Sequence, residues 1–193
     1  ITGIISGTGV TLTKAGAGTL TLSGANTYSG STTITAGVLS VSSVADGGLA
    51  SNLGQSSNAD TSLVFNGGTL QFTGSGSGAT DRTLSGAAAS TNGALTKIGS
   101  GTLVLSGDNQ YTGATTINAG TLTVTSTGSI GGSAGVTTTA LTISSATLNL
   151  QRAITVGSLS MSGTSPAITN TTGASSLVVS GTSTLAGNIT TSG

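Results

Sequence analysis

The sequence predicts an all-β protein, a right-handed parallel β-helix of about eight or nine coils that runs through residues 1–193 as one continuous solenoid. Three observations predict this fold. A stretch of 32 residues, 12–43, returns without a gap at 95–126, with 21 identical positions. A shorter pattern, with two apolar positions separated by one residue, recurs along the chain. Charged residues, which usually solvate the outer faces of helices, are almost absent.

The composition favours strands over helices and over disorder. Only 4 Lys and Arg and 4 Asp and Glu occur in 193 residues, and the polar positions hold Thr, Ser and Asn, which suit strands and turns. Disorder is excluded because 35% of the residues are apolar and the net charge is zero. The charged residues are Lys14, Lys97, Arg82, Arg152, Asp46, Asp60, Asp81 and Asp108.

The charge and hydropathy pattern also limits the partners. No run of 18 apolar residues occurs, and the opening ITGIISGTGV has no features of a leader, so we expect no membrane contact within this fragment. Net charge zero predicts no nucleic-acid partner and favours self-association, end to end or lateral. With no Cys, disulfides and thiolate metal sites are excluded.

The shorter pattern predicts the strands of the coils. It reads small residue, Thr or Ser, Leu, any residue, apolar residue, and this alternation is typical of a strand with one buried face. Further strands are expected at 10–13, 32–35, 62–65, 115–118 and 141–144. The predicted core pairs are Leu20/Leu22, Leu39/Val41, Leu70/Phe72, Leu103/Leu105, Leu122/Val124, Leu148/Leu150, Leu159/Met161 and Leu177/Val179.

Glycines at matching points of the two long copies predict the corners of the coils. Glycine adopts positive φ angles at low steric cost, and a small residue lets successive coils approach closely. The six predicted corners are Gly24, Gly30, Gly37, Gly107, Gly113 and Gly120.

The two long copies share the pattern LTKxGxGTLxLSGxNxYxGxTTIxAGxLxV. This pattern resembles the passenger-associated transport repeat, also called the autotransporter-associated β-strand repeat, of bacterial autotransporter passengers. The resemblance covers about a third of the chain closely, at 12–43 and 95–126, and LVFNGGTLQFTG at 63–74 is similar to the coils between such repeats. It implies a parallel β-helix passenger displayed outside a Gram-negative-type cell.

Catalytic chemistry has few candidate residues. Without His, Cys or Glu, no Ser-His-Asp set, Cys-His pair or imidazole metal site can form, so we predict no catalytic, cofactor-binding or metal site and no cofactor. A Ser-Lys dyad at Lys14 or Lys97 is the weaker alternative to two solvated lysines near strand ends. The aspartates Asp46, Asp60, Asp81 and Asp108 could include a glycosidase pair, but turn and loop roles are favoured.

Asn26 with Asn109, and Tyr28 with Tyr111, are kept in both copies. Tyrosines on a rod could stack on sugar rings, whereas the favoured interpretation is structural: Asn bonds the corner backbone and Tyr covers the corner with its hydroxyl in water. The glycine-rich segments 74–78 and 131–135 lack a phosphate-loop motif and are interpreted as loops.

The functional expectation is a non-enzymatic extracellular or cell-surface structural or adhesive β-helix, in which copies could assemble into filaments. The alternatives are a carbohydrate-binding adhesin and a polysaccharide-degrading β-helix enzyme. Surface glycans are the partners expected for the adhesive versions.

Overall fold

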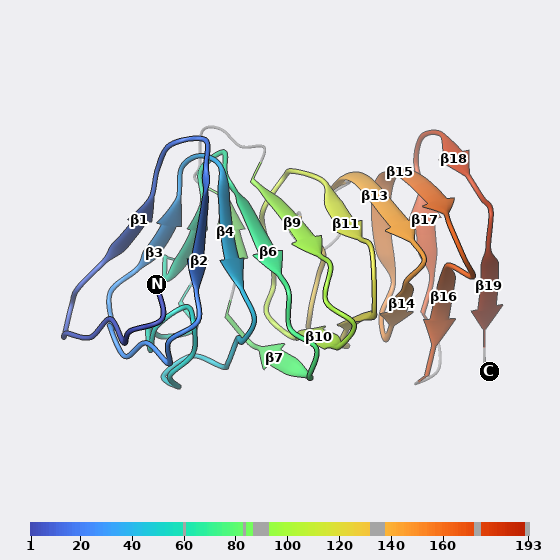
Figure 1. Cartoon of the computed structure of the whole chain (residues 1–193). Helices are drawn as coiled ribbons and strands as arrows, with labels where there is room; N and C mark the ends of the chain where they lie inside the picture. Colours follow the sequence, from blue (N-terminus) through green and yellow to red (C-terminus); the bar gives the residue numbers. More distant parts are fainter. Residues whose placement is uncertain (60, 83, 87–92, 132–137, 172–174, 192–193) are drawn as a thin grey trace.

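A computed structural model describes residues 1–59, 61–82, 84–86, 93–131, 138–171 and 175–191. Three parallel sheets form the wall of a β-solenoid, and the chain winds from the N-terminal end at the left of Figure 1 to the C-terminal end at the right. Sheet 1 contains β1 (Leu12–Lys14), β3 (Thr32–Ile34), β5 (Leu63–Phe65) and β8 (Leu84–Gly86).

Sheet 2 runs through the whole solenoid, and sheet 3 forms beside it in the C-terminal half. Sheet 2 contains β2 (Thr19–Leu22), β4 (Val38–Val41), β6 (Thr69–Phe72), β9 (Ala94–Lys97), β11 (Thr115–Ile117), β13 (Thr138–Ser144), β15 (Ile154–Ser162), β17 (Leu177–Val179) and β18 (Ser183–Thr184). Sheet 3 contains β7 (Gly78–Thr80), β10 (Thr102–Leu105), β12 (Thr121–Val124), β14 (Thr147–Leu150), β16 (Ala167–Asn170) and β19 (Asn188–Thr191).

The parallel β-helix is therefore confirmed, but with about 7 turns instead of the eight or nine predicted. The difference comes from coil length. Leu20 pairs with Leu39 after a regular step of 19 residues, whereas Leu39 pairs with Leu70 only after 31, because a folded loop follows β4. Coils that include such loops use more residues per turn, so fewer turns fit into the chain.

The core lies where the two-residue alternation predicted it. Thirteen of the sixteen predicted positions are buried, and Leu20, Leu177 and Val179 are only partly buried. These three belong to β2 and β17, which lie at the ends of sheet 2 and have a neighbouring strand on one side only. Burial in this fold therefore depends on stacking between coils.

Several strands were not predicted from the sequence. The expected additional strands are present as β1, β3, β5, β11 and β13, with ends shifted by up to three residues. The strands β9, β16, β18 and β19 were not predicted, nor were β7 (GAT) and β8 (LSG), which lack the two apolar positions of the short pattern. β7 and β8 form strands because they pair with β10 and β5, and not because of a strand pattern in their own sequences.

The predicted glycine corners have two different causes. Gly37 and Gly120 adopt positive φ angles of 64° and 66°, as expected. Gly24, Gly30 and Gly107 do not, and the positive-φ explanation is wrong for them. Instead, a Cβ at these three positions would meet a backbone carbonyl of the preceding coil. Close stacking of coils is what excludes a side chain there.

The second long copy is turned by one side of the solenoid relative to the first. In the first copy the LTK strand β1 lies in sheet 1 and the TLTL strand β2 in sheet 2; in the second copy the equivalent strands β9 and β10 lie in sheets 2 and 3. The insertion of β5 to β8 between the copies causes this shift, since β9 stacks on β6 through the pair Leu70–Leu95. Equal sequences therefore occupy different sides.

The 11 positions that differ between the copies lie on the outside. All of them are exposed or half-buried except the outward-facing pair Ser40 and Thr123, which are 6% and 8% exposed. The fully buried side chains are the same in both copies, including Lys, Asn, Tyr and Ile at equivalent places. The interior of the repeat is thus fixed while its surface varies.

Candidate functional site

Lys14 and Lys97 lie inside the solenoid, so the prediction that they are solvated is wrong. They are 5% and 0% exposed. The Nζ of Lys14 donates to the carbonyls of Ala15, Gly16 and Ala36 at 3.0, 2.7 and 2.9 Å. These carbonyls lie at the corners of two successive coils. Their acceptors replace water around the ammonium group and explain its burial.

Lys97 occupies the equivalent cage in the second copy. Its Nζ donates to Gly99 O at 2.6 Å and Ala119 O at 3.1 Å, and lies 5.6 Å from the ring centroid of Phe72. Burial lowers the pKa of Lys97. Every acceptor recorded for the two ammonium groups in the described chain is a backbone carbonyl, so the geometry gives no support to a Ser-Lys dyad.

The two tyrosines are also buried, which overturns the prediction of wet hydroxyls. Tyr28 and Tyr111 are both 0% exposed. Their hydroxyls hydrogen-bond Thr32 Oγ1 at 2.6 Å and Thr115 Oγ1 at 2.7 Å. The Tyr111 ring also packs against Phe65 with centroids 5.5 Å apart. Neither ring is therefore available to stack on a sugar.

Burial of Tyr111 predicts a loss of stability at alkaline pH. Desolvation raises the pKa of this phenol above its ordinary value of 10.0, so above pH 10 the unfolded state ionises while the folded state stays protonated. Stability is fully present below pH 10 and falls as the pH rises, by about 1.4 kcal/mol per pH unit for this group. We expect Tyr111→Phe to lower the free energy of unfolding by about 1 kcal/mol at pH 8 through the lost hydrogen bond.

The same variant should lose less stability above pH 10, because it lacks this phenol. Urea denaturation between pH 8 and pH 11.5 should show the wild-type and Tyr111→Phe curves converging as the pH rises. Parallel curves would contradict the assignment of alkaline instability to Tyr111.

Asn26 and Asn109 bond the backbone, as predicted. Asn26 Oδ1 accepts from Ile5 N at 2.8 Å, and its Nδ2 donates to Asn52 O at 2.7 Å. In the second copy Asn109 accepts from Leu84 N at 2.9 Å and donates to Ser129 O at 2.6 Å. Each side chain thus joins three successive coils, so its role is to hold the stack together.

Asp46 and Asp81 meet at one corner, beside the buried Arg82. Asp46 Oδ1 accepts from the backbone N of Asp81 at 2.9 Å, and Asp81 Oδ1 accepts from Gly47 N at 2.7 Å. The second oxygen of Asp81 accepts from Asn58 Nδ2 at 3.2 Å. These contacts tie the loop after β4 to the turn between β7 and β8, as turn aspartates do.

Arg82 is a further buried cation, and its burial was not predicted from the sequence. It is 1% exposed, and its guanidinium donates from Nη1 to Leu53 O at 3.0 Å and from Nη2 to Leu49 O and Gly54 O at 3.1 and 2.9 Å. Burial lowers its pKa, and nearby Tyr28, Asp81 and Asp46 oppose this effect. One signal was available: Thr80, Arg82 and Leu84 continue the alternation of inward positions.

Asp108 makes its recorded contact elsewhere in the described chain. Asp108 is exposed and accepts from Ser129 Oγ at 3.4 Å, and Asp60 lies outside the described residues. Among the part of the chain that is described, no group of three His, Cys, Asp or Glu side chains could hold a metal ion. Of the predicted loop 74–78, residues 74–77 lie between β6 and β7 and Gly78 begins β7; of the predicted loop 131–135, residues 132–135 lie outside the described residues.

The outer face of sheet 2 carries a row of uncharged polar side chains that crosses successive strands from one end of the sheet to the other. We call this row the polar ladder; its members pair in register on successive strands, and all but Ser40 are exposed or half-buried. No member carries a charge. The ladder consists of Thr21, Ser40, Gln71, Thr96, Thr116, Thr142, Ser160 and Thr184.

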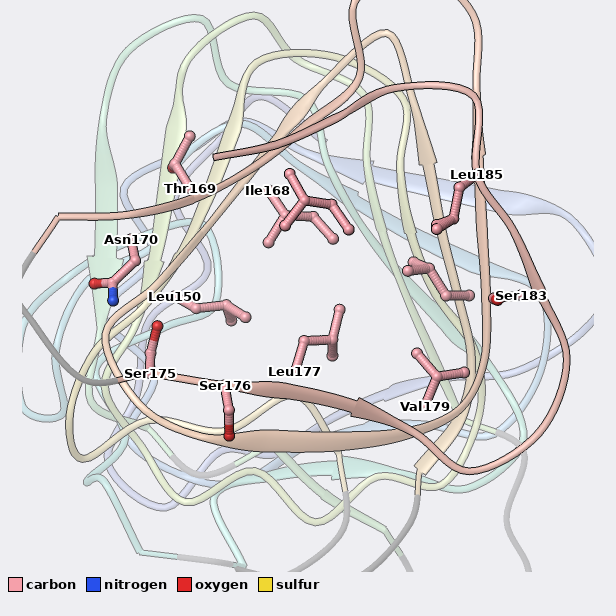
Figure 2. Close-up of a pocket in the computed structure, with 12 residues that line it drawn as sticks. Leu150, Ile168, Thr169, Asn170, Ser175, Ser176, Leu177, Val179, Ser183 and Leu185 are labelled. Atoms are coloured by element: carbon pink, nitrogen blue, oxygen red, sulfur yellow. The ribbon is translucent and has the colours of Figure 1, made fainter. Parts of the chain in front are cut away.

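The interior opens at the C-terminal end. A cavity of about 220 Å³ is lined mainly by apolar side chains of the last coils, and Figure 2 shows Leu150, Ile168, Leu177 and Leu185 turned toward its centre. We call this cavity the C-terminal mouth. The polar side chains of its lining are uncharged and include Asn170, Ser175 and Ser183.

The geometry of the repeats agrees with the comparison to known families, which matched residues 12–41 and 95–124. Both segments match the model of the passenger-associated-transport-repeat. Its matched residues include the caged lysine, the joining asparagine and the buried tyrosine of each copy. The repeat is thus a unit of coil stacking, because these shared polar groups all face the interior.

A longer protein is similar to part of this chain. The adhesin BmaC autotransporter of Brucella suis biovar 1 (strain 1330) is 46% identical over 125 residues, which is 54% of this chain and 4% of that protein. The chain therefore spans a small fraction of the length of this relative. No solved structure matches the chain significantly. A helix long and apolar enough to span a bilayer is absent from the described residues.

Proposed function

We propose that this chain is a non-enzymatic segment of a cell-surface adhesive passenger, which presents an uncharged, hydroxyl-rich wall to its partners. One observation carries the proposal: the chemically distinctive groups of both repeats are buried and bonded within the solenoid. The groups left for a partner are mostly Thr, Ser and Asn on the outer faces. The similarity to an autotransporter adhesin supports a location at the cell surface.

The polar ladder is the proposed contact face. Hydroxyl and amide groups donate and accept hydrogen bonds, and a straight row of them suits an extended ligand with many hydroxyls, such as a surface glycan. Because no charge lies in the ladder, binding should depend little on salt concentration. Contacts of this kind are individually weak and gain strength by repetition along the rod.

A pair of matched double variants tests the proposal. Thr96→Glu with Thr142→Glu places two charges on the polar ladder, separated by one strand, and should reduce binding of the purified chain to the glycosylated surface of cultured animal cells at least tenfold. Thr102→Glu with Thr147→Glu is the control, since these outward threonines of sheet 3 have the same spacing and are also half-buried. Cytometry with labelled protein measures both.

The proposal fails if the wild-type chain does not bind the cells, or if both double variants bind equally. Treatment of the cells with glycosidases before binding separates glycan from protein ligands. Loss of binding after treatment is expected.

A polysaccharide-degrading enzyme is the second candidate, favoured only by the meeting of Asp46 and Asp81. A glycosidase needs one carboxyl to protonate the leaving oxygen and another to act as nucleophile or base. Here three of the four carboxyl oxygens already accept hydrogen bonds within the corner, one from the backbone of Asp81 and two from the loop after β4. Hydrolysis of a polysaccharide that Asp81→Asn abolishes, without loss of folded protein, would establish this candidate instead.

A further inference from the structure

The polar ladder has a large apolar neighbour at its middle strands. Ile98 directly follows β9 and continues the alternation of that strand, in which Thr96 faces outward and Lys97 faces the interior. The Ile98 side chain is 40% exposed, beside a row that otherwise offers hydroxyl and amide groups. The outer face of sheet 2 therefore combines an apolar contact with hydrogen-bonding groups at this place.

An amide side chain lies next to Ile98 on the neighbouring strand. Asn118 directly follows β11, and its backbone N donates to Lys97 O at 2.8 Å, so it extends the pairing of β9 with β11 (Figure 1). Since Thr96 pairs with Thr116, the same register places Asn118 beside Ile98 two residues further on. Neighbouring strands lie about 4.8 Å apart, so one small chemical group can contact both side chains.

The hydrogen-bonding groups at this place have capacity for a partner. Among the described residues, no hydrogen bond is recorded for the hydroxyls of Thr96 and Thr116 or for the side-chain amide of Asn118. Asn118 is exposed, and the two threonines are half-buried. The charged group of this strand pair, the ammonium of Lys97, is buried and bonded to backbone carbonyls. The surface thus offers an apolar side chain, an amide and two hydroxyls without a charge.

The first long copy lacks this combination, although its lysine cage is the same. The equivalents of Ile98 and Asn118 are Ala15 and Thr35. The hydroxyl of Thr35 donates to Lys14 O at 2.9 Å, so it serves the backbone of the corner. Because the cage forms with either pair of residues, stacking of the coils does not require Ile98 and Asn118. Their apolar and amide groups are a property of the outer surface of the second copy.

From these observations we propose that the polar ladder binds a neutral glycan that contains N-acetylated sugars, with one acetamido group held between Ile98 and Asn118. This inference rests on the proposed adhesive function and names the class of its ligand. The methyl group of the acetamido substituent packs on Ile98. Its amide exchanges hydrogen bonds with the Asn118 amide, since each amide has both donors and an acceptor. Hydroxyls of the sugar lie over Thr96 and Thr116.

The rest of the surface determines the form of the glycan. All four aromatic side chains of the chain are buried, so the apolar contact with a sugar comes from an aliphatic side chain. An acidic sugar would lose water around its charge without gaining a cation from the ladder. Strands about 4.8 Å apart repeat the ladder hydroxyls at close to the length of one sugar unit in an extended chain. The glycan is therefore unbranched at the contact and crosses the strands along the solenoid axis.

Two oligosaccharides that differ in one kind of group test the proposal. Isothermal titration calorimetry measures binding of the wild-type chain to the linear tetramer of N-acetylglucosamine and to the glucose tetramer of the same linkage, in which a hydroxyl replaces each acetamido group. The N-acetylated tetramer should bind roughly tenfold more tightly, as expected for one packed methyl group and a hydrogen-bonded amide. Ile98→Ala with Asn118→Thr should bind both tetramers equally. This double variant should fold normally, because Ala15 and Thr35 occupy these places in the first copy.

Val104→Thr with Thr123→Ser is the matched control. It also gives the second copy two residues of the first, the equivalents Thr21 and Ser40, but it changes the outer face of sheet 3. This variant should keep the preference of the wild-type chain for the N-acetylated tetramer.

The proposal is overturned if the wild-type chain binds neither tetramer, if it binds both equally, or if the preference survives in Ile98→Ala with Asn118→Thr. Binding to cells is a separate measurement. Wild-type binding to cells that Thr96→Glu with Thr142→Glu abolishes, together with equal binding of the two tetramers, would leave the adhesive function standing and remove only its N-acetylated ligand.

Discussion

Gly120→Ala should lower the free energy of unfolding by about 3 kcal/mol or more, through strain and a clash between coils. Gly120 has a φ of 66°, which costs a residue with a Cβ about 1 to 2 kcal/mol. The added methyl group would also meet the carbonyl oxygens of Gly99 and Ser100, each 2.6 Å away, and that of Gly101. These carbonyls belong to the preceding coil, so the coils would have to separate locally.

Gly16→Ala is the control for this prediction. Gly16 has a similar φ of 73°, but a Cβ added there would have nothing within 4 Å of it. This variant should therefore lose only about 1 to 2 kcal/mol, from backbone strain alone. Urea denaturation followed by circular dichroism measures both variants. Equal losses would mean that φ, and not the approach of successive coils, explains the glycine at this corner.

Arg82→Met should destabilise the protein by about 3 to 5 kcal/mol, which is large for one substitution. Methionine keeps most of the side-chain volume but removes the donors that satisfy the carbonyls of Leu49, Leu53 and Gly54. Unpaired buried carbonyls cost about 1 to 3 kcal/mol each. The loop after β4 should detach first, because its ties to the next coil depend on Arg82 and its neighbour Asp81.

Hydrogen exchange locates this effect within the chain. The amides of Gly48 and Gln55, which donate to Ser56 O and Tyr28 O, should exchange faster in Arg82→Met. Arg152→Met is the control, since Arg152 is half-buried and its Nη1 donates to the carbonyls of Thr127 and Gly128. It should lose less than about 1 kcal/mol. Equal losses would show that burial of Arg82 contributes little.

Alternation along the strands predicted most of the fold. The pairs Leu39/Val41 and Leu103/Leu105 are buried because every second residue of a strand faces the same side, which is a local property that a sequence displays. The rotation of the second copy could not be predicted in this way. The rotation depends on how many sides of the solenoid are formed by the segment between the copies. Short strands such as GAT and LSG have too little apolar alternation to be predicted, so the number of sides cannot be derived from the sequence.

The buried polar groups were harder to predict for a related reason. Lysine is rarely buried, and only the carbonyls of two stacked corners make the position of Lys97 favourable. One of those carbonyls belongs to Ala119, which lies 22 positions after Lys97 in the sequence, so no local pattern brings the two together. The role of Asn109 could be predicted, because asparagine tends to hydrogen-bond nearby backbone groups at corners, which is a local property.

The difference between the copies has a consequence for evolution. The two copies differ in charge, amide content and bulk at Ala25/Asp108, Thr27/Gln110 and Ala15/Ile98, whereas the lysine cages and joining asparagines are the same in both. Outward positions of the repeat can therefore change one at a time while the side chains that face the interior are kept. The residues that vary on the surface and the residues that stabilise the fold are therefore two separate sets.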